Sequence, residues 1–133
     1  MRFIPTRIHG ILDYLVGIIL IAAPWLLNFN QGGAETWVPV IVGVMVLLQT
    51  ILTDFEVGLV RKLPMKTHLS MDFFIGLFLA LSPWLFGFAD FIAWPHVVFG
   101  VFSILASLTT HTVPAGQDRG YNPVADRNPN IRR

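Results

Sequence analysis

The stretch Arg2–Phe29, RFIPTRIHGILDYLVGIILIAAPWLLNF, decides the fold because the chain contains a second version of it. Moving 59 positions along the chain, residues 61–88 read RKLPMKTHLSMDFFIGLFLALSPWLFGF. Ten of the 28 aligned positions are identical, among them a His, an Asp, two Pro and a Trp. A match of this kind predicts a tandem duplication whose two copies occupy equivalent surroundings.

The composition indicates a membrane protein. Hydrophobic residues make up 54% of the 133 residues, charged residues only 13%, and the mean hydropathy is +0.65. A water-soluble domain carries about 25% charged residues. The chain has no Cys, which excludes disulfides, thiolate metal sites and Cys nucleophiles.

Four apolar runs predict four transmembrane helices. They cover residues 8–29, 37–52, 69–88 and 91–109. At about 1.5 Å per residue they reach roughly 24–33 Å, against a hydrocarbon core of about 30 Å, and the run 37–52 is the shortest. The first run is not a cleaved signal peptide, because the same pattern recurs inside the chain. We therefore expect an all-α membrane protein with four transmembrane helices, built as two tandem helical hairpins that run in the same direction.

The basic residues predict that both termini are cytoplasmic. All nine Lys and Arg lie in the N-terminal segment, the middle linker or the C-terminal tail, and none lies in the loops 30–36 and 89–90. The positive-inside rule places the basic segments in the cytoplasm of a multi-pass protein of the cell (inner) membrane. All four Trp then fall at the opposite interface: Trp25, Trp37, Trp84 and Trp94.

The predicted four-helix bundle covers residues 1–112. Repeat one spans 2–53 and repeat two spans 61–112, and residues 113–133 are predicted to be a disordered cytoplasmic tail. Between the repeats, Thr53 and Glu56 fit a capping box. This pattern predicts an interfacial helix over 54–63 with Phe55 turned toward lipid.

Two short motifs carry the chemistry of the chain. His9 and Asp13, like His68 and Asp72, lie four residues apart and therefore share one helix face. Small residues continue that face or occupy matching positions on the second helix of each hairpin: Gly17, Gly76, Gly43 and Gly100. A polar and then small stripe favours close helix contact. It predicts that the helices carrying the two motifs face each other along the stripe and bring the four ionisable groups together.

Several roles are open for these four residues. Each His could pair with its own Asp and lock the bundle, or the group could relay or sense protons or ions. It could also bind a divalent metal, or His9 and His68 could be the axial ligands of a haem. No cofactor is favoured by the sequence. The residues that could extend the site at the same end are Asp54, Glu56 and His111.

Prolines mark the other end of the bundle. Pro24 and Pro83 remove a backbone donor about a turn before their helices end, which predicts a kink that turns the following Trp into the interface. The alternative is that the carbonyl freed near Leu20 or Leu79 lines a pathway. His96 has no counterpart in the first repeat, and we interpret it as an interfacial residue.

Ser82-Pro83-Trp84, with Ala23-Pro24-Trp25 at the matching place, resembles the motif of the SPW-repeat family of small prokaryotic membrane proteins. The resemblance covers residues 2–112, although Ala23 departs from the motif. It implies an integral membrane protein of two helical hairpins, and it carries over no enzymatic activity, substrate or cofactor.

No enzyme motif is present in the sequence, which has no GxSxG, HExxH or phosphate-binding glycine loop. We therefore expect a non-enzymatic membrane module that acts by association with itself or with a membrane partner. The alternatives are proton or ion translocation or sensing, and binding of a metal or haem. The lipid bilayer is an expected partner, and nucleic acid is not, because the basic residues are few.

Overall fold

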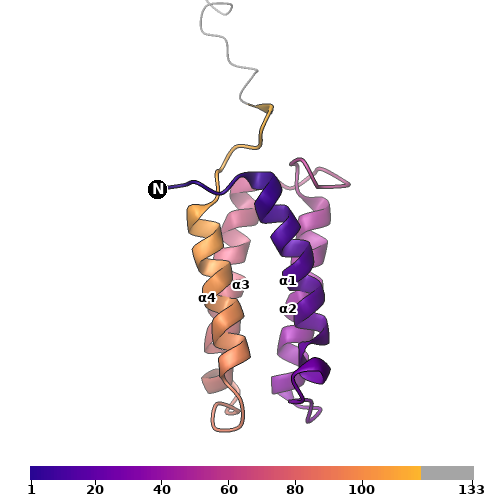
Figure 1. The fold of residues 1–133 in the computed structure, drawn as a ribbon, viewed down its shortest axis with the longest axis vertical. Helices are drawn as coiled ribbons and strands as arrows, with labels where there is room; N and C mark the ends of the chain where they lie inside the picture. The colour runs from indigo at the N-terminus through magenta and orange to yellow at the C-terminus, as the bar shows by residue number, and fades with distance from the viewer. Residues whose placement is uncertain (118–133) are drawn as a thin grey trace, which may run out of the picture.

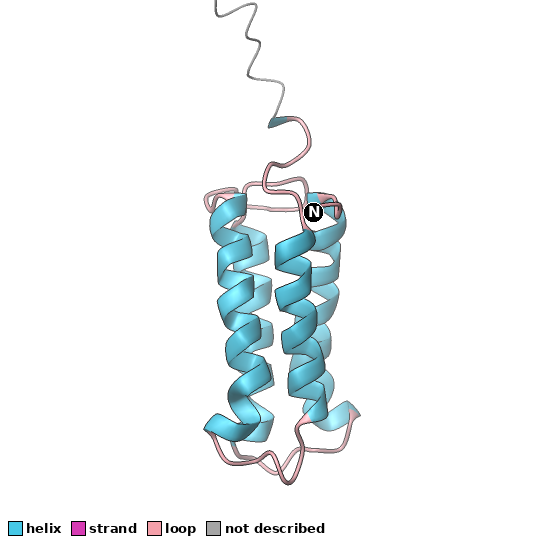
Figure 2. Ribbon diagram, turned by 90° about the vertical axis from the view of Figure 1, so that its left-hand side faces the viewer, coloured by secondary structure: helices cyan, strands magenta, loops and turns pink. Residues whose placement is uncertain are grey.

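The computed structural model describes residues 1–117, and over this range the chain forms one bundle of four α-helices (Figure 1). The helices run side by side, and the loops gather at the two ends of the bundle (Figure 2). Their bounds are α1 Thr6–Leu26, α2 Ala34–Leu52, α3 Met65–Leu85 and α4 Trp94–Thr109. The predicted all-α, four-helix fold is confirmed. Most of the predicted tail, from residue 118 onward, lies outside the described residues.

Three of the helices, α1, α2 and α3, are long and apolar enough to cross a membrane. The short helix is α4 with 16 residues, whereas α2 has 19 because it begins at Ala34 rather than at Trp37. In α4 the start is set by Pro95, which lies in the first turn, where a missing N–H costs nothing. Phe91 therefore belongs to the preceding loop.

The bundle buries ionisable and hydroxyl groups beside an apolar core and exposes many large apolar side chains, unlike a water-soluble protein. Phe74 is 67% exposed and Ile18 58% exposed, while Thr36, Thr50 and His68 are completely buried. Such a distribution is stable when lipid surrounds the helices, because ionisable and hydroxyl groups then avoid hydrocarbon by facing the interior.

Glycines hold each hairpin together. A Cβ added to Gly43 of α2 would lie 2.6 Å from the carbonyl oxygen of Gly17 in α1, and one added to Gly100 of α4 would lie 2.5 Å from that of Gly76 in α3. The prediction that α1 and α3 meet along this stripe is therefore wrong below the His/Asp positions. The glycines serve contacts within hairpins, and α1 and α3 stand diagonally opposite in the bundle (Figure 1).

The segment between α2 and α3 is not the predicted helix 54–63. The capping box does not form because both of its side chains have other partners: the Thr53 hydroxyl donates to the Gln49 carbonyl of α2 and contacts His68, and Glu56 accepts a bond from Thr6. Phe55, expected to face lipid, is 2% exposed and packs with Met65 and Leu69.

Two short crossings join the hairpins at this end. Ile4, just before α1, forms a parallel bridge with Thr110 at the end of α4, and Leu63, just before α3, forms one with Thr53 at the end of α2. The partners match at spacings of 59 and 57, so each hairpin reaches across to the other in the same way. These crossings bring the starts of α1 and α3 over the bundle axis.

Candidate metal centre

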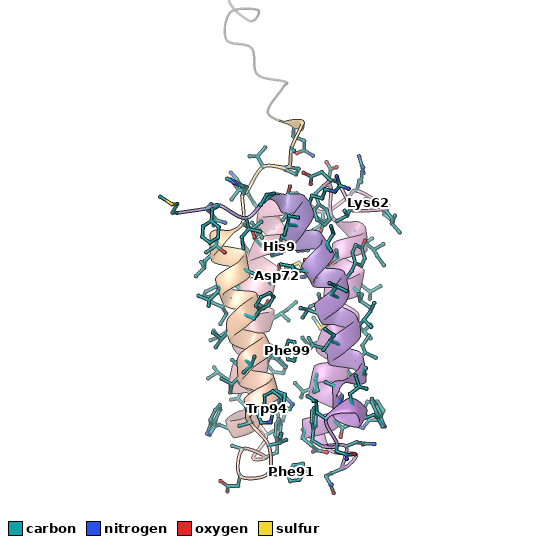
Figure 3. The ribbon with its side chains drawn as sticks, in the orientation of Figure 1. His9, Lys62, Asp72, Phe91, Trp94 and Phe99 are labelled. Carbon is teal, nitrogen blue, oxygen red and sulfur yellow. The ribbon has the colours of Figure 1, made fainter. Side chains whose placement is uncertain are left out.

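Four side chains form a closed ring on the bundle axis between α1 and α3. His9 Nε2 lies 2.9 Å from Asp72 Oδ2 and 3.2 Å from Asp13 Oδ2. Symmetrically, His68 Nε2 lies 2.9 Å from Asp13 Oδ2 and 3.1 Å from Asp72 Oδ2. Each His therefore contacts the Asp of its own helix and the Asp of the opposite helix. The predicted convergence of these residues is what the structure has, and Figure 3 locates His9 and Asp72 near the end of the bundle where Lys62 lies.

The ring is almost completely withdrawn from solvent. Exposure of the side chains is 1% for His9, 0% for His68, 2% for Asp72 and 13% for Asp13. Unpaired ionisable groups at membrane depth cost several kcal/mol, about 2.5–3.5 on insertion scales. Their retention here depends on mutual pairing, and Asp13 is the only member through which the ring meets its surroundings.

Two threonines fix the orientation of the imidazoles. Thr53 Oγ1 donates to the Gln49 carbonyl at 2.6 Å and lies 2.7 Å from His68 Nδ1. Because a hydroxyl has one proton, Thr53 must accept from His68, so Nδ1 carries hydrogen.

Thr110 repeats this arrangement at His9. Its hydroxyl donates to the Ala106 carbonyl at 2.7 Å and lies 2.8 Å from His9 Nδ1. Each imidazole thus receives its orienting threonine from the opposite hairpin. Both Nε2 atoms are left to face the two carboxylates.

The two aspartates are held unequally. Outside the ring, Asp72 Oδ1 accepts a bond from the side-chain amide of Gln49, whereas Asp13 has the Thr50 hydroxyl at 3.4 Å. The position that matches Gln49 in the second hairpin is Ala106, which cannot supply an amide. Gln49 Oε1 is itself buried without a partner among the described residues. The ring is therefore symmetric in its ligand atoms and asymmetric in its support.

The ring has the dimensions of a metal site. Its four inward atoms, two Nε2 and two Oδ2, lie within 4.8 Å of one another. Neighbouring atoms of the ring lie 2.9–3.2 Å apart. A flat square with such sides has its corners about 2.1 Å from its centre, close to a Zn–N or Zn–O bond length, and the four ligand atoms would move out of that plane to give the tetrahedral arrangement of a Zn²⁺ site. A haem does not fit, because the two carboxylates occupy the space between the imidazoles that a porphyrin would need. The haem hypothesis is therefore wrong for these residues.

Below the ring the bundle axis is closed by apolar side chains. The enclosed space beside His9 and Asp13 is about 10 Å³, which is the size of a single water at most. It continues only into a core that contains Leu20, Val42 and Leu79. The described residues thus offer no continuous polar pathway from the ring toward the other end of the bundle.

Asp54, Glu56 and His111, predicted as extensions, lie at the same end but do not join the ring. Glu56 instead accepts hydrogen bonds from Thr6 at 2.7 and 2.8 Å and from the Ala115 N–H at 3.0 Å. Burial alone would raise the pKa of Glu56, but these bonds and the nearby charge of Arg7 hold it below its ordinary value. Glu56 therefore links the start of α1 to the segment after α4, and these hydrogen bonds are called the Glu56 latch below.

The prolines at the far end explain the neighbouring serine. Pro83 has no N–H for the carbonyl of Leu79, four residues earlier, and Ser82 Oγ donates to that carbonyl at 2.7 Å. Ala23, at the matching position before Pro24, has no hydroxyl to offer Leu20. In α3 the freed carbonyl is therefore satisfied locally rather than lining a pathway.

The tryptophans lie where the sequence predicted, together at the end of the bundle opposite the ring. All are at least half exposed: Trp25 51%, Trp37 50%, Trp84 61% and Trp94 55%. After α1 and after α3, a residue with positive φ reverses the chain direction: Asn28 in the first hairpin and Gly87 in the second. Phe29 and Phe88 then enter the core at 1% and 8% exposure.

His96 is buried and not interfacial as expected. It is 1% exposed, lies between Phe29 and Phe88, and its Nε2 donates to the Glu35 carbonyl of α2 at 3.0 Å. That carbonyl lacks a helical donor because Pro39 lies four residues later. His96 Nδ1 is buried without a partner among the described residues.

The fold and the ring define the class of the molecule: a helical integral membrane protein in which two His and two Asp converge inside the bundle at one end. The family profile of the SPW repeat domain matches residues 7–110, so the chain belongs to that family. Comparison with curated proteins finds no match, and comparison with solved structures finds none either.

Proposed function

We propose that the ring of His9, Asp13, His68 and Asp72 binds a divalent metal ion of the Zn²⁺ class. The observation that carries the proposal is the ring itself: two nitrogens and two oxygens, at the spacing of a four-coordinate site, on one axis. Imidazole and carboxylate ligands at this number suit first-row divalent cations better than Ca²⁺ or Mg²⁺, which take six or more oxygens.

The outer contacts of the ring support this function. A ligating His commonly donates its second ring N–H to a fixed acceptor, which orients the ring. Thr53 and Thr110 are such acceptors, at 2.7 and 2.8 Å. Because both Nδ1 atoms carry hydrogen, both Nε2 atoms can offer lone pairs inward when the imidazoles are neutral.

Charge balance is compatible with a divalent cation that replaces two protons of the ring. Two neutral imidazoles and two carboxylates carry a charge of −2, and among the described residues no Lys or Arg lies within ion-pair distance of them. Without an ion, a proton on each Nε2 balances that charge, and a bound divalent ion would take the place of those two protons. Ligands must lose their protons to bind, so affinity is expected to rise with pH.

Metal titration of the purified full chain tests the proposal. After treatment with a chelator, we expect one Zn²⁺ per chain by isothermal titration and elemental analysis, with binding lost in His68→Ala. His111→Ala, which removes an exposed His at the same end, is the matched control. Thr110→Val is expected to weaken binding about 10- to 100-fold while the helical circular dichroism is retained. Absence of stoichiometric zinc in the folded wild type, or equal loss in His111→Ala, would overturn the proposal.

The orientation prediction belongs to the same proposal. The end that carries the ring also carries Arg2, Arg7, Arg61, Lys62 and Lys66, whereas the loops at the tryptophan end carry no basic residue. By the positive-inside rule this supports a ring on the cytoplasmic side of the cell (inner) membrane. Impermeant thiol labelling of Arg61→Cys in intact cells checks this, and labelling from outside would contradict it.

Other predictions of the sequence accompany this proposal. The crossings and threonine–imidazole contacts that recur at spacings of 57 and 59 support an origin by duplication. A non-enzymatic role through self-association or a membrane partner stays a prediction, and native mass spectrometry that found only monomer would count against it. Proton sensing would use the same ring, and it would be favoured over metal binding if zinc failed to bind the folded protein.

A further inference from the structure

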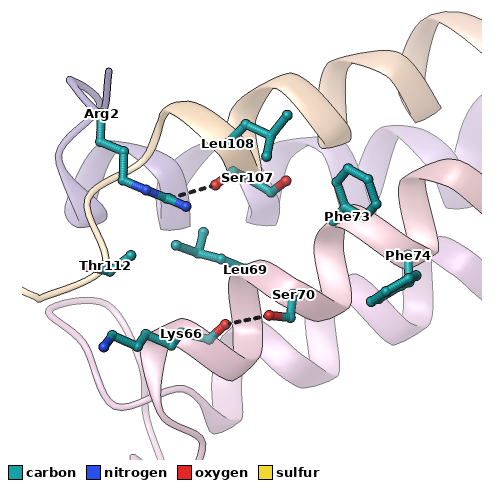
Figure 4. A pocket seen from close by; sticks show the side chains of 9 residues that line it. All are labelled: Arg2, Lys66, Leu69, Ser70, Phe73, Phe74, Ser107, Leu108 and Thr112. Atoms are coloured by element: carbon teal, nitrogen blue, oxygen red, sulfur yellow. Dashed lines mark hydrogen bonds between the residues drawn. The ribbon is translucent and has the colours of Figure 1, made fainter.

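The outer face of the second hairpin has an open groove near the ring end. Its volume is about 450 Å³, and it lies between the N-terminal segment, α3 and α4 (Figure 4). Arg2 and Lys66 lie at one end of this groove, and Phe73 and Phe74 lie further along α3. Leu108 of α4 also lines the groove. The groove therefore combines a cationic mouth with an aromatic floor.

Both cations of the groove are available to an anion. Arg2 uses Nη1 to donate to the carbonyls of Ser107 at 3.0 Å and Thr110 at 2.6 Å, which fixes the guanidinium at the end of α4. A guanidinium has further N–H donors. Among the described residues no carboxylate pairs with Arg2 or Lys66, because the ion pairs there are all between His and Asp. The groove thus presents two uncompensated positive charges.

Within residues 1–117, the chain itself fills the equivalent place on the first hairpin. Gly10 matches Leu69 at a spacing of 59, and a side chain at position 10 would collide with Phe55 and Val57. Tyr14, which matches Phe73, donates to the Val57 carbonyl at 2.9 Å. After α4, the position that matches Phe55 is Thr112, a smaller residue that lines the groove. The space that Phe55 and Val57 fill beside the first hairpin is therefore left open beside the second hairpin.

We propose that this groove binds one anionic glycerophospholipid, with its phosphate on Arg2 and Lys66 and an acyl chain along Phe73, Phe74 and Leu108. From Lys66 to Phe74 the helix descends about 12 Å, which is the distance from headgroup level into the acyl region. An anionic lipid has a negative phosphate that can pair with the two cations and an apolar acyl chain that can pack on the aromatic side chains. Basic pockets between membrane helices bind anionic headgroups in the same way. This site is independent of the metal ring.

Native mass spectrometry of the detergent-purified full chain tests the assignment, with phosphatidylglycerol and phosphatidylcholine titrated separately. We expect one phosphatidylglycerol to bind with clear preference over phosphatidylcholine. Lys66→Gln is expected to weaken it about fivefold, as one lysine near a charged surface contributes. Arg7→Gln is the matched control, because Arg7 holds the equivalent position in the first hairpin, and it should leave binding unchanged.

A second variant tests the apolar part of the groove. Ser70 is exposed on the groove wall, so Ser70→Trp should block the acyl chain and release phosphatidylglycerol without disturbing the fold. Equal retention of the two lipids, or equal weakening in Arg7→Gln and Lys66→Gln, would overturn the proposal. Displacement of the lipid by millimolar inorganic phosphate alone would also overturn it, because the groove would then be a site for free phosphate.

Discussion

At each end of the bundle, histidine side chains join two diagonally opposite helices, but the two ends differ in the number and charge of the groups involved. At the ring end, α1 and α3 are joined by two His and two Asp, and every nitrogen of the two imidazoles has a partner. At the tryptophan end, α4 and α2 are joined by one neutral bond from His96 to Glu35, and His96 Nδ1 has no partner among the described residues.

This difference indicates that His96 has a structural role, whereas the ring is a candidate binding site. His96 supplies a donor to one carbonyl that Pro39 leaves free, and its surroundings are the aromatic rings of Phe29 and Phe88. The ring instead concentrates four ionisable groups where one would already be costly. Because no backbone defect explains that concentration, the ring end is the place to expect a ligand.

The largest effect should come from Asp72→Ala. It removes one of the two carboxylates that both buried imidazoles contact and leaves the Gln49 amide without its acceptor, and removal of one member of a buried pair costs about 3–5 kcal/mol. Asp13→Ala should cost less, because Asp13 is 13% exposed and its contact outside the ring is the Thr50 hydroxyl at 3.4 Å. Steric-trap unfolding in detergent micelles measures both, and an Asp13 effect equal to or above that of Asp72 would contradict the unequal support.

A smaller effect is expected at the tryptophan end from Ser82→Ala. The Leu79 carbonyl would lose its only substitute for the N–H that Pro83 lacks, at a cost of about 1 kcal/mol. Ala23→Ser is the reciprocal change and should stabilise the protein by a smaller amount, because it offers a hydroxyl near the Leu20 carbonyl. Thermal midpoints of the two variants should therefore move in opposite directions, and a shift of both in one direction would argue against this role for Ser82.

His96→Phe should change stability still less. The Glu35 carbonyl loses a donor, but the unpartnered Nδ1 is removed, and the new ring keeps its place between two other aromatics. The two contributions are each about 1 kcal/mol and oppose each other. A loss as large as that of Asp72→Ala would show that the two ends are equally dependent on histidine.

The smallest effect is a pH dependence at the Glu56 latch. The pKa of Glu56 is lowered in the folded protein from its ordinary value of 4.5, so its stabilisation is present above that pH and is lost as pH falls through the folded value. Glu56→Gln should be slightly less stable than the wild type at pH 7, and the difference should shrink as the pH falls below 4.5 and vanish once it lies below the folded pKa. A difference that persisted unchanged in acid would assign the effect to shape rather than charge.

Local spacing was enough to predict the helices and the convergence of the ring. Apolar runs fixed four helices within a few residues, and two His-x3-Asp motifs at equivalent positions of a duplicated hairpin could only meet near the axis. The helices that the glycines contact could not be predicted, because a small side chain permits close approach of any neighbouring helix and does not select one. Gly17 and Gly76 therefore contact Gly43 and Gly100 of their own hairpins.

Tertiary competition explains the other errors. Thr53 and Glu56 have the spacing of a capping box. In the folded chain, however, Thr53 contacts His68 and Glu56 accepts a bond from Thr6, so neither side chain caps a helix. The orienting role of Thr53 and Thr110 left a signal in the sequence, since the two match at a spacing of 57. Gln49 left none, because Ala106 replaces it in the second hairpin. His96 faces a carbonyl freed on another helix, which no local pattern reports.

The paired crossings before α1 and α3 have a consequence for the order of the chain. Ile4 meets Thr110 as Leu63 meets Thr53, so the end of the second hairpin already lies against the start of the first. A circular permutant that opens the linker near Gly58 and joins residue 112 to residue 2 would keep every helix beside its present neighbours. Either hairpin can then be synthesised first without altering which threonine meets which imidazole.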